Sequence, residues 1–377
     1  AVVGATGLTS KVSGGDSIII DGTRGLVISE PDEQTRQEYE QAEERLIEFG
    51  HELDELRDLP AVTRDGVEVK LLGNIEFPHE VVVCLERGAQ GIGLYRTEFL
   101  YLRGETEPTE ADHYEAYREA VEAVGGRPIV IRTLDLGADK YAQITGEERE
   151  RNPFLGLRSI RFCLSHVGLF KAQLRAILRV SVLGDVSIMF PLITKLTEIR
   201  QAKWVLAEAM EDLEEEGLPY RRDIRVGVMI ETPSAVAIAG ALAHEADFFS
   251  IGTNDLIQYT LAVDRSNERV APLYTAADPS VIRFVRDVLY TANRKGIECS
   301  LCGEMAGDPI YTLLLLGLGL RKFSMAPNAI PEIKRVVRSV SITHAEQVAH
   351  RVLGMESDRE IGNYLRDELR KILPQVV

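Results

Sequence analysis

The sequence has few cysteines, an excess of acidic over basic residues and no long apolar run. Four cysteines in 377 residues are too few for a disulfide framework, so we expect a reducing, cytoplasmic setting. With 43 Lys and Arg against 59 Asp and Glu, the net charge is -16, which argues against nucleic-acid or anionic-membrane binding. Apolar runs such as Leu313 to Leu316 are far too short to span a membrane, and no membrane insertion is expected.

The chain begins AVVGATGLTS, without an initiating Met or a charged segment that leads into an apolar one. We therefore expect no export signal, and we expect the chain to be a fragment of a longer protein. Its 45% hydrophobic and 27% charged residues are typical of a soluble globular enzyme. Its length suits one large barrel plus a lesser piece.

The N-terminal residues predict two small elements. Ser17 to Ile20 and Leu26 to Ile28 are apolar runs separated by a turn signal, and two such strands cannot bury a core alone. We assign residues 1–31 to the tail of a domain whose body lies upstream. Residues 32–60 have apolar positions at spacings of three and four among many charges, which predicts a helical linker.

From residue 61 to residue 377, apolar strand candidates alternate with helical segments, a pattern typical of a parallel sheet with crossover helices. Eight strands over this length predict an α/β fold, a TIM (β/α)8 barrel, with an open doubly wound sheet as the alternative. The strand candidates are Val69–Ile75, Gly91–Arg96, Pro128–Leu134, Val186–Leu192, Arg225–Glu231, Asp247–Ile251, Ile297–Cys302 and Arg321–Met325. The helix candidates include Glu110–Val124, Leu169–Ser181, Leu196–Glu216, Ser234–Ala243 and Pro279–Lys295.

Arginines stand at or just after several predicted strand ends. In a TIM barrel the catalytic groups lie at the carboxyl ends of the strands. Arg96 and Arg132 end two strands, and Arg158 and Arg161 follow in the segment NPFLGLRSIR. Guanidinium groups bind phosphate and carboxylate oxygens bidentately. Each could be a structural ion pair, but together they predict an anionic substrate.

Two carboxylates follow consecutive strands. Glu231 ends RVGVMIE and Asp255 lies in SIGTNDL. Mg²⁺ commonly takes one or two protein carboxylates and fills its octahedron with water and substrate oxygens, so the pair predicts a magnesium site. The alternative is that each is an N-cap or an arginine partner. The turn that holds Asn254 could aim amides at an anion, and Arg265 could reach back towards it.

Cys299 and Cys302 form a C-x-x-C pair. No second pair or histidine at zinc spacing accompanies it, and strand residues three apart point to opposite faces, so a shared metal site is not expected. Cys302 alone stands at a strand end, where a thiol could serve as an acid or base. A buried packing role is the alternative.

Six blocks in register resemble enzyme I of the phosphoenolpyruvate (PEP):sugar phosphotransferase system. The resemblance covers essentially the whole span from about Leu59 to the C-terminus. The blocks are GLYRTEFL (Gly93–Leu100), IVIRTLDLGADK (Ile129–Lys140), NPFLGLRSIR (Asn152–Arg161), GVMIETPSA (Gly227–Ala235), FFSIGTNDLIQYTLAVDR (Phe248–Arg265) and CGEMAGD (Cys302–Asp308).

The resemblance implies a TIM barrel that binds PEP with Mg²⁺, releases pyruvate and forms a homodimer through the barrel. It implies that Glu231 and Asp255 hold Mg²⁺ and that Cys302 gives a proton to the methylene carbon of the enolate. The substrate contacts that it implies are Arg96, Arg132, Arg265, Asn254 and Asp255, supported by Arg158 and Lys140.

One departure from the family concerns the phosphoryl acceptor. The family uses a histidine in a Gly-Gly-x-Thr-Ser-His type motif of a swivelling domain, and none of the seven histidines here stands in such a motif. Residues 1–31 would then be the tail of that domain, with the acceptor and the helical domain that docks the carrier protein HPr upstream. We expect the chain alone to bind PEP without phosphorylating HPr.

Three other functions remain open at this stage. Pyruvate phosphate dikinase and PEP synthase share the barrel and much of the site chemistry, although the short linker favours enzyme I. A Mg²⁺-dependent lyase or aldolase would not need three phosphate-directed arginines. A non-catalytic PEP-binding dimerisation module is the remaining alternative, and the intact set of site residues argues against it for the parent protein.

Overall fold

The computed structural model describes residues 7–22, 25–102, 107–136 and 150–374, together with Val2 and Ala5. It falls into two compact units, Ala1–Glu55 and Leu56–Val377. Within the described part of the chain, no helix is long and apolar enough to cross a membrane. The assignment of residues 1–31 to a phosphohistidine domain stays a prediction.

The first unit contains the expected hairpin and helix. Strands β1 (Ile18–Asp21) and β2 (Leu26–Ser29) pair antiparallel. A short 3-10 turn, η1 (Leu8–Ser10), precedes them, and helix α1 (Glu33–Asp54) follows them. The α1 helix ends at Asp54, before the end of the predicted linker at residue 60, and the chain then passes through turns.

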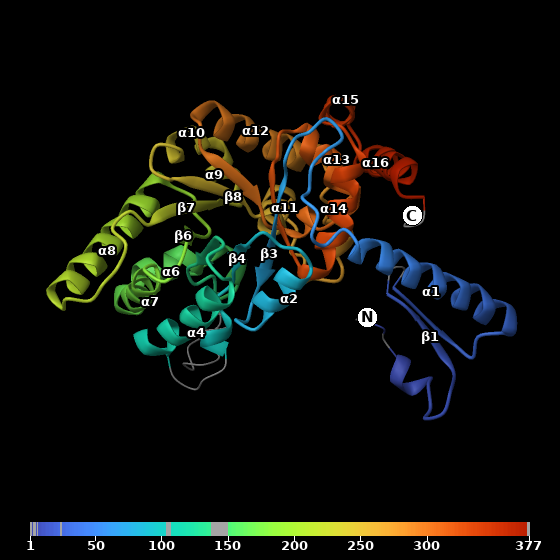
Figure 1. Cartoon of the computed structure of the whole chain (residues 1–377), viewed down its shortest axis with the longest axis horizontal. Helices are drawn as coiled ribbons and strands as arrows, with labels where there is room; N and C mark the ends of the chain where they lie inside the picture. Colours follow the sequence, from blue (N-terminus) through green and yellow to red (C-terminus); the bar gives the residue numbers. More distant parts are fainter. Residues whose placement is uncertain are drawn as a thin grey trace. The chain divides into compact units, whose positions relative to one another are not determined.

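The second unit is a closed barrel of eight parallel strands with helices outside them, so the TIM-barrel prediction is confirmed (Figure 1). Around the barrel each strand pairs with the next in sequence, and β10 closes against β3. All eight predicted strands form, most of them shorter by a residue or two at the ends. They are β3 (Lys70–Ile75), β4 (Ile92–Tyr95), β5 (Ile129–Arg132), β6 (Val186–Phe190), β7 (Arg225–Ile230), β8 (Phe248–Ile251), β9 (Glu298–Leu301) and β10 (Lys322–Met325).

The predicted helices form, with one correction. The segment predicted as the helix Ser234–Ala243 is two short helices, α9 (Pro233–Ala237) and α10 (Ala239–Leu242), because Ile238 between them departs from helical backbone angles. The other predicted helices are α4 (Glu110–Ala123), α7 (Val167–Val180), α8 (Leu196–Glu215) and α12 (Pro279–Lys295). Further helices are α2 (Glu80–Glu86), α3 (Phe99–Leu102), α6 (Ser159–Ser165), α11 (Thr253–Leu261), α13 (Pro309–Gly317), α14 (Ile330–Ser339), α15 (Ile342–Leu353) and α16 (Asp358–Ile372).

The strands are buried on both faces, as expected for a parallel sheet covered by helices. Every residue of β6 and of β8 is buried. Near the carboxyl ends of the strands, Met229 and Cys302 belong to one buried cluster. Because the strands are parallel, the residues that follow them meet at this one end of the barrel.

Candidate active site

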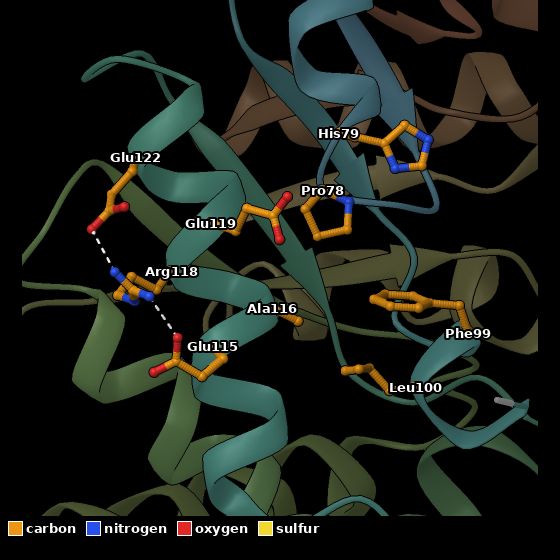
Figure 2. A pocket seen from close by; sticks show the side chains of 9 residues that line it. All are labelled: Pro78, His79, Phe99, Leu100, Glu115, Ala116, Arg118, Glu119 and Glu122. Carbon is orange, nitrogen blue, oxygen red and sulfur yellow. Dashed lines mark hydrogen bonds and ion pairs between the residues drawn. The ribbon is translucent and has the colours of Figure 1, made fainter. Parts of the chain in front are cut away.

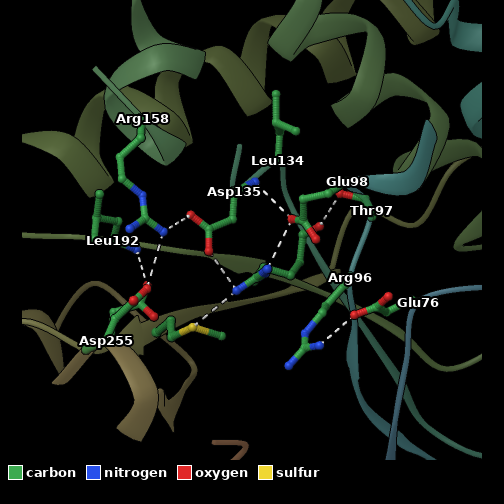
Figure 3. A network of polar contacts seen from close by, with 12 residues as sticks. Glu76, Arg96, Thr97, Glu98, Leu134, Asp135, Arg158, Leu192 and Asp255 are labelled. Carbon is green, nitrogen blue, oxygen red and sulfur yellow. Dashed lines mark hydrogen bonds and ion pairs between the residues drawn. The ribbon is translucent and has the colours of Figure 1, made fainter. Parts of the chain in front are cut away.

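Two buried arginines share one carboxylate beyond the end of β5. Arg132 Nη1 lies 2.8 Å from Asp135 Oδ2, and Arg158 Nη2 lies 2.9 Å from Asp135 Oδ1. Figure 3 shows Asp135 beside Arg158 at the centre of this polar network. Burial alone would lower the pKa of both guanidinium groups, but the neighbouring carboxylates raise it above its usual value. The two cations are therefore held charged and close together.

A second carboxylate fixes the position of Arg132. Glu98 Oε1 lies 3.1 Å from Arg132 Nη2 and also accepts a hydrogen bond of 3.0 Å from the backbone N–H of Asp135. Arg132 Nη1 contacts the Met229 sulfur at 3.9 Å. Among the described residues, the buried Arg132 Nε has no hydrogen-bond partner. The two carboxylates therefore fix the position of the Arg132 guanidinium, and its Nε–H remains available as a hydrogen-bond donor to a ligand.

The two predicted metal ligands come from neighbouring strands. Glu231 directly follows β7 and is 2% exposed, and its Oε1 accepts a hydrogen bond of 2.6 Å from the backbone N–H of Leu192. Asp255 lies in the first turn of α11, which follows β8, and its Oδ2 lies 3.3 Å from Arg158 Nη2. A Cβ atom added at Gly252 would lie 2.6 Å from Glu231 Oε2, so a larger residue there would displace the Glu231 carboxylate.

The electrostatics of this pair suit a divalent cation. The pKa of Glu231 is raised to about 8, mainly by burial and also by the negative charges of Asp255 and Asp135, while the charge of Arg132 opposes the rise. Asp255 Oδ1 is buried and has no hydrogen-bond partner in the described part of the chain. Two carboxylates are a usual protein contribution to a Mg²⁺ octahedron. The pair therefore fits the magnesium site that the sequence predicts.

Cys302 follows β9 and is 2% exposed. Its Sγ lies 3.7 Å from the backbone oxygen of Ile251. Burial raises the pKa of the thiol above its ordinary value, and the charge of Glu231 adds to this effect, although nearby arginines oppose it. The group is therefore a protonated thiol at neutral pH, which is the form that a proton donor needs.

A cavity of about 740 Å³ opens at this end of the barrel. Its lining includes Arg96, Asn254 and Cys302. Arg96 is paired with Glu76 at 2.7 Å and is partly exposed. Asn254 donates a hydrogen bond of 3.0 Å to Glu304 Oε1 and accepts one of 2.9 Å from the Glu304 backbone N–H. The cavity thus brings three of the predicted site residues together.

Arg265 and Arg161 are not among the described residues that line the cavity. Arg265 is exposed. Its positive charge acts on Tyr274, a residue that lines the cavity. The pKa of Tyr274 is raised to about 12 by burial, and the charge of Arg265 opposes this rise. Arg265 therefore lies close to Tyr274 of the cavity lining. Lys140 lies outside the described residues. Arg161 donates to the backbone oxygens of Leu155 and Gly156 and serves its own loop.

Two residues of the site were absent from the sequence prediction, Asp135 and Glu98. A signal for both existed, because each carboxylate follows a strand-end arginine closely, as in R-T-L-D and R-T-E. Asn74, near the end of β3, also supports the site. Its Nδ2 donates a hydrogen bond of 2.9 Å to the backbone oxygen of Cys302, so it braces the loop that carries the thiol.

A second hollow, of about 450 Å³, lies on the outer wall of the barrel unit. Figure 2 shows that one side is formed by Glu115, Arg118 and Glu122 of α4. Arg118 is held by both carboxylates, at 2.6 Å from Glu115 and 3.4 Å from Glu122. Its charge is already neutralised, so this hollow is a poor site for an anion.

Comparison with known proteins gives a consistent result. The model of a family described as "PEP-utilising enzyme, PEP-binding domain" matches residues 50–342. The chain is 45% identical over 370 residues to a phosphoenolpyruvate-protein phosphotransferase from Staphylococcus aureus, covering 97% of this chain and 65% of the relative. It is 44% identical over 367 residues to the same-named protein of Staphylococcus carnosus (strain TM300), covering 97% of this chain and 64% of that protein.

The chain is thus shorter than these relatives and spans 65% of the length of the first. Among solved structures, it is similar to a citrate lyase from Burkholderia xenovorans LB400 at 16% identity and a TM-score of 0.40, covering 69% of this chain and 79% of that one. A likeness at this level carries no argument about function.

Proposed function

The chain belongs to the PEP-utilising enzymes, and we propose that it is the PEP-binding part of a phosphoenolpyruvate-protein phosphotransferase. In the complete protein, the barrel would pass the phosphoryl group of PEP to a histidine outside this chain and then to HPr, releasing pyruvate. The names of its relatives favour this activity over that of a dikinase or PEP synthase. A cytoplasmic setting and a homodimer formed through the barrel are parts of the same proposal.

One observation carries the proposal. Arg132 and Arg158 are held together by Asp135. Arg158 also contacts Asp255, whose negative charge raises the pKa of the buried Glu231. The two arginines can bind the phosphate of the substrate, and the two carboxylates, Asp255 and Glu231, can bind a divalent cation. A site for a neutral or cationic substrate would have no use for two buried guanidinium groups that share a carboxylate.

The arginines would bind and polarise the phosphate. Arg132 and Arg158 can each present two N–H groups to phosphoryl oxygens, while Arg96 and Asn254 line the cavity where the rest of the substrate would lie. Glu231 and Asp255 would hold Mg²⁺, which when bound neutralises charge on phosphate oxygens. In the complete protein, the nitrogen of the acceptor histidine would form a bond to phosphorus as the bond between phosphorus and the enol oxygen breaks. The electron pair of the broken bond would stay on that oxygen as an enolate.

Cys302 would complete the reaction. The enolate needs one proton at its methylene carbon to become pyruvate, and the thiol of Cys302 can supply it. Burial raises the pKa of this thiol, which keeps the proton in place until a strong carbon base is formed. Asn74 holds the Cys302 backbone oxygen and would thereby keep the sulfur at one position.

Calorimetric titration with PEP, in the presence and absence of Mg²⁺, tests this function. We expect Mg²⁺-dependent binding that Arg132→Ala weakens at least a hundredfold, because a charged hydrogen-bonding partner of the phosphate is lost. The matched control is Arg118→Ala, which removes an arginine of the outer hollow and should leave binding unchanged. Absence of binding by the wild-type chain, or equal effects of the two variants, would contradict the proposal.

A further inference from the structure

The end of β5 lacks a regular strand partner on its β4 side. Strand β4 stops at Tyr95, and the register between the two strands shifts between Ile92 and Tyr95. The backbone groups of β5 beyond this point must find other partners, because buried N–H and C=O groups are costly when unpaired. These groups carry Arg132 and lead to Asp135, so whatever binds them sets the position of the anion-binding pair.

Two buried side chains provide the missing bonds. Thr97 Oγ1 donates a hydrogen bond of 3.0 Å to the backbone oxygen of Arg132. Gln173 Oε1, from α7, accepts one of 3.0 Å from the backbone N–H of Leu134. Both Thr97 and Gln173 are 0% exposed. Figure 3 shows Thr97 and Leu134 in the network that also contains Asp135.

The amide of Gln173 is fully engaged. Its Nε2 donates to Thr97 Oγ1 at 3.1 Å and to the hydroxyl of Tyr117 at 2.9 Å. Because Gln173 Oε1 accepts from Leu134, the three bonds together determine the orientation of the amide, with its oxygen towards Leu134 and its nitrogen towards Thr97. One side chain on an outer helix therefore ties together the loop after β4, the end of β5 and helix α4.

The contact with α4 is itself anchored. Tyr117 lies 2.9 Å from His113 Nδ1, and His113 Nε2 lies 3.2 Å from the hydroxyl of Tyr101. His113 is 0% exposed, and burial lowers its pKa to about 4, so the ring is neutral at ordinary pH. A neutral imidazole between two hydroxyls continues the hydrogen-bond chain without placing a charge in the core.

We propose that Thr97 and Gln173 are positioning residues for the PEP site. They do not touch substrate; they hold the end of β5 so that Arg132 and Asp135 meet Arg158 in the geometry that binds phosphate. This inference rests on the proposed function, because the quantity it predicts is affinity for PEP. It goes beyond that function because it assigns a positioning role to two fully buried side chains that contact the backbone of the site residues and not the substrate.

A pair of variants at Thr97 tests the proposal. Thr97→Val keeps the shape of the side chain and removes the hydroxyl, whereas Thr97→Ser keeps the hydroxyl and removes a methyl group. We expect Thr97→Val to weaken Mg²⁺-dependent PEP binding roughly tenfold, because it removes both buried hydrogen bonds of the hydroxyl, the one to Arg132 and the one from Gln173. Thr97→Ser keeps both bonds and should stay within about twofold of wild type. Gln173→Met, which removes all three bonds of the amide, should weaken binding at least as much as Thr97→Val.

Leu174→Ala is the structural control. Leu174 is a buried neighbour of Gln173 on α7, and its truncation should lower the melting temperature without changing PEP affinity. The proposal is overturned if Thr97→Val binds PEP as wild type does, if Thr97→Ser binds as weakly as Thr97→Val, or if Leu174→Ala weakens binding equally. A wild-type chain that fails to bind PEP would instead contradict the proposed function itself, and this inference with it.

Discussion

At the scale of single residues, the site consists of charges that depend on each other. Asp135 receives a guanidinium on each of its two oxygens, and its side chain is only 5% exposed. Removing this buried partner leaves two like charges close together, with only Glu98 and Asp255 as their remaining counter-ions. The stability of the barrel and the binding of an anion are therefore connected through this one carboxylate.

The first prediction follows from that connection. Asp135→Asn should lower the free energy of unfolding by about 3 kcal/mol, because two buried guanidinium groups lose their shared counter-ion. Saturating PEP should reduce this loss, since its phosphate supplies the missing negative charge. Thermal or urea unfolding with and without PEP measures both effects.

Asp367→Asn is the control for this experiment. Asp367 makes an exposed ion pair with Arg370 on α16, and such pairs contribute little. If Asp135→Asn lowered the free energy of unfolding no more than Asp367→Asn does, the two arginines would not depend on the shared carboxylate.

His113 gives a prediction about pH. Burial lowers its pKa from 6.5 to about 4, so between these values the unfolded chain binds a proton that the folded chain does not. The contribution of His113 is therefore fully present above pH 6.5 and is lost as pH falls towards 4, by roughly 3 kcal/mol in total. His113→Gln should flatten this part of the stability curve, as measured by unfolding at successive pH values.

The same substitution at His350, which is exposed, is the comparison. It should leave the pH dependence of the wild type intact. If His113→Gln and His350→Gln gave the same curve as wild type, the buried imidazole would not be the group that responds to acid.

Most of the individual site residues could be predicted because chemistry and position coincide in the sequence. Arg132, Glu231 and Cys302 each stand where an apolar run ends, and such ends meet at one face of a barrel. The bridging role of Asp135 could not be predicted, since it depends on where a second arginine from a later segment lies. The role of Gln173 could not be predicted from the sequence either, because the groups that its amide binds come from distant segments of the chain.

At the scale of elements, close approaches between loops decide the geometry. A Cβ atom added at Gly303 would lie 1.9 Å from Thr253 Oγ1 and 2.8 Å from the Thr253 backbone nitrogen. Thr253 begins α11, the helix whose first turn contains Asn254 and Asp255. The loop after β9 and the start of α11 therefore fit together only with glycine at position 303.

Gly303→Ala should displace the start of α11 and weaken Mg²⁺-dependent PEP binding about tenfold or more, with a lower melting temperature. Gly168→Ala is a matched control, because Gly168 lies in the first turn of α7 with open space around its Cβ position. That change should be neutral or slightly stabilising, as alanine favours helix. Calorimetry measures the PEP affinity of both variants, and thermal melting measures their stability. If Gly303→Ala and Gly168→Ala had the same affinity and melting temperature, the close contact at position 303 would not determine the geometry of the site.

The elements themselves were predictable to different degrees. The eight strands were found because continuous apolar runs stand out when both faces of a sheet are covered. The break between α9 and α10 was missed because it depends on the backbone at Ile238, an apolar residue that fits a continuous helix pattern. Boundaries of this kind are set by tertiary packing rather than by local preference.

At the scale of the whole molecule, charge is distributed unevenly. The chain carries a net charge of -16, yet the site places two buried arginines next to each other. All the described residues that form the site belong to the unit Leu56–Val377. The hairpin and helix of the unit Ala1–Glu55 contribute none of them.

A chain shortened to residues 56–377 should therefore bind PEP with Mg²⁺ within about threefold of the full chain, which corresponds to well under 1 kcal/mol. Calorimetry on both proteins measures this, with circular dichroism to establish that the shortened chain is folded. A large loss of affinity in a folded, shortened chain would mean that the first unit takes part in the site.

The most direct test of the central claim is a crystal structure of this chain with PEP and Mn²⁺, whose anomalous signal locates the metal in place of Mg²⁺. We predict one metal bound by Glu231 and Asp255, phosphate oxygens on Arg132 and Arg158, and the methylene carbon of PEP facing Cys302 Sγ. A metal away from both carboxylates, or PEP bound with its methylene carbon turned from the thiol, would contradict it.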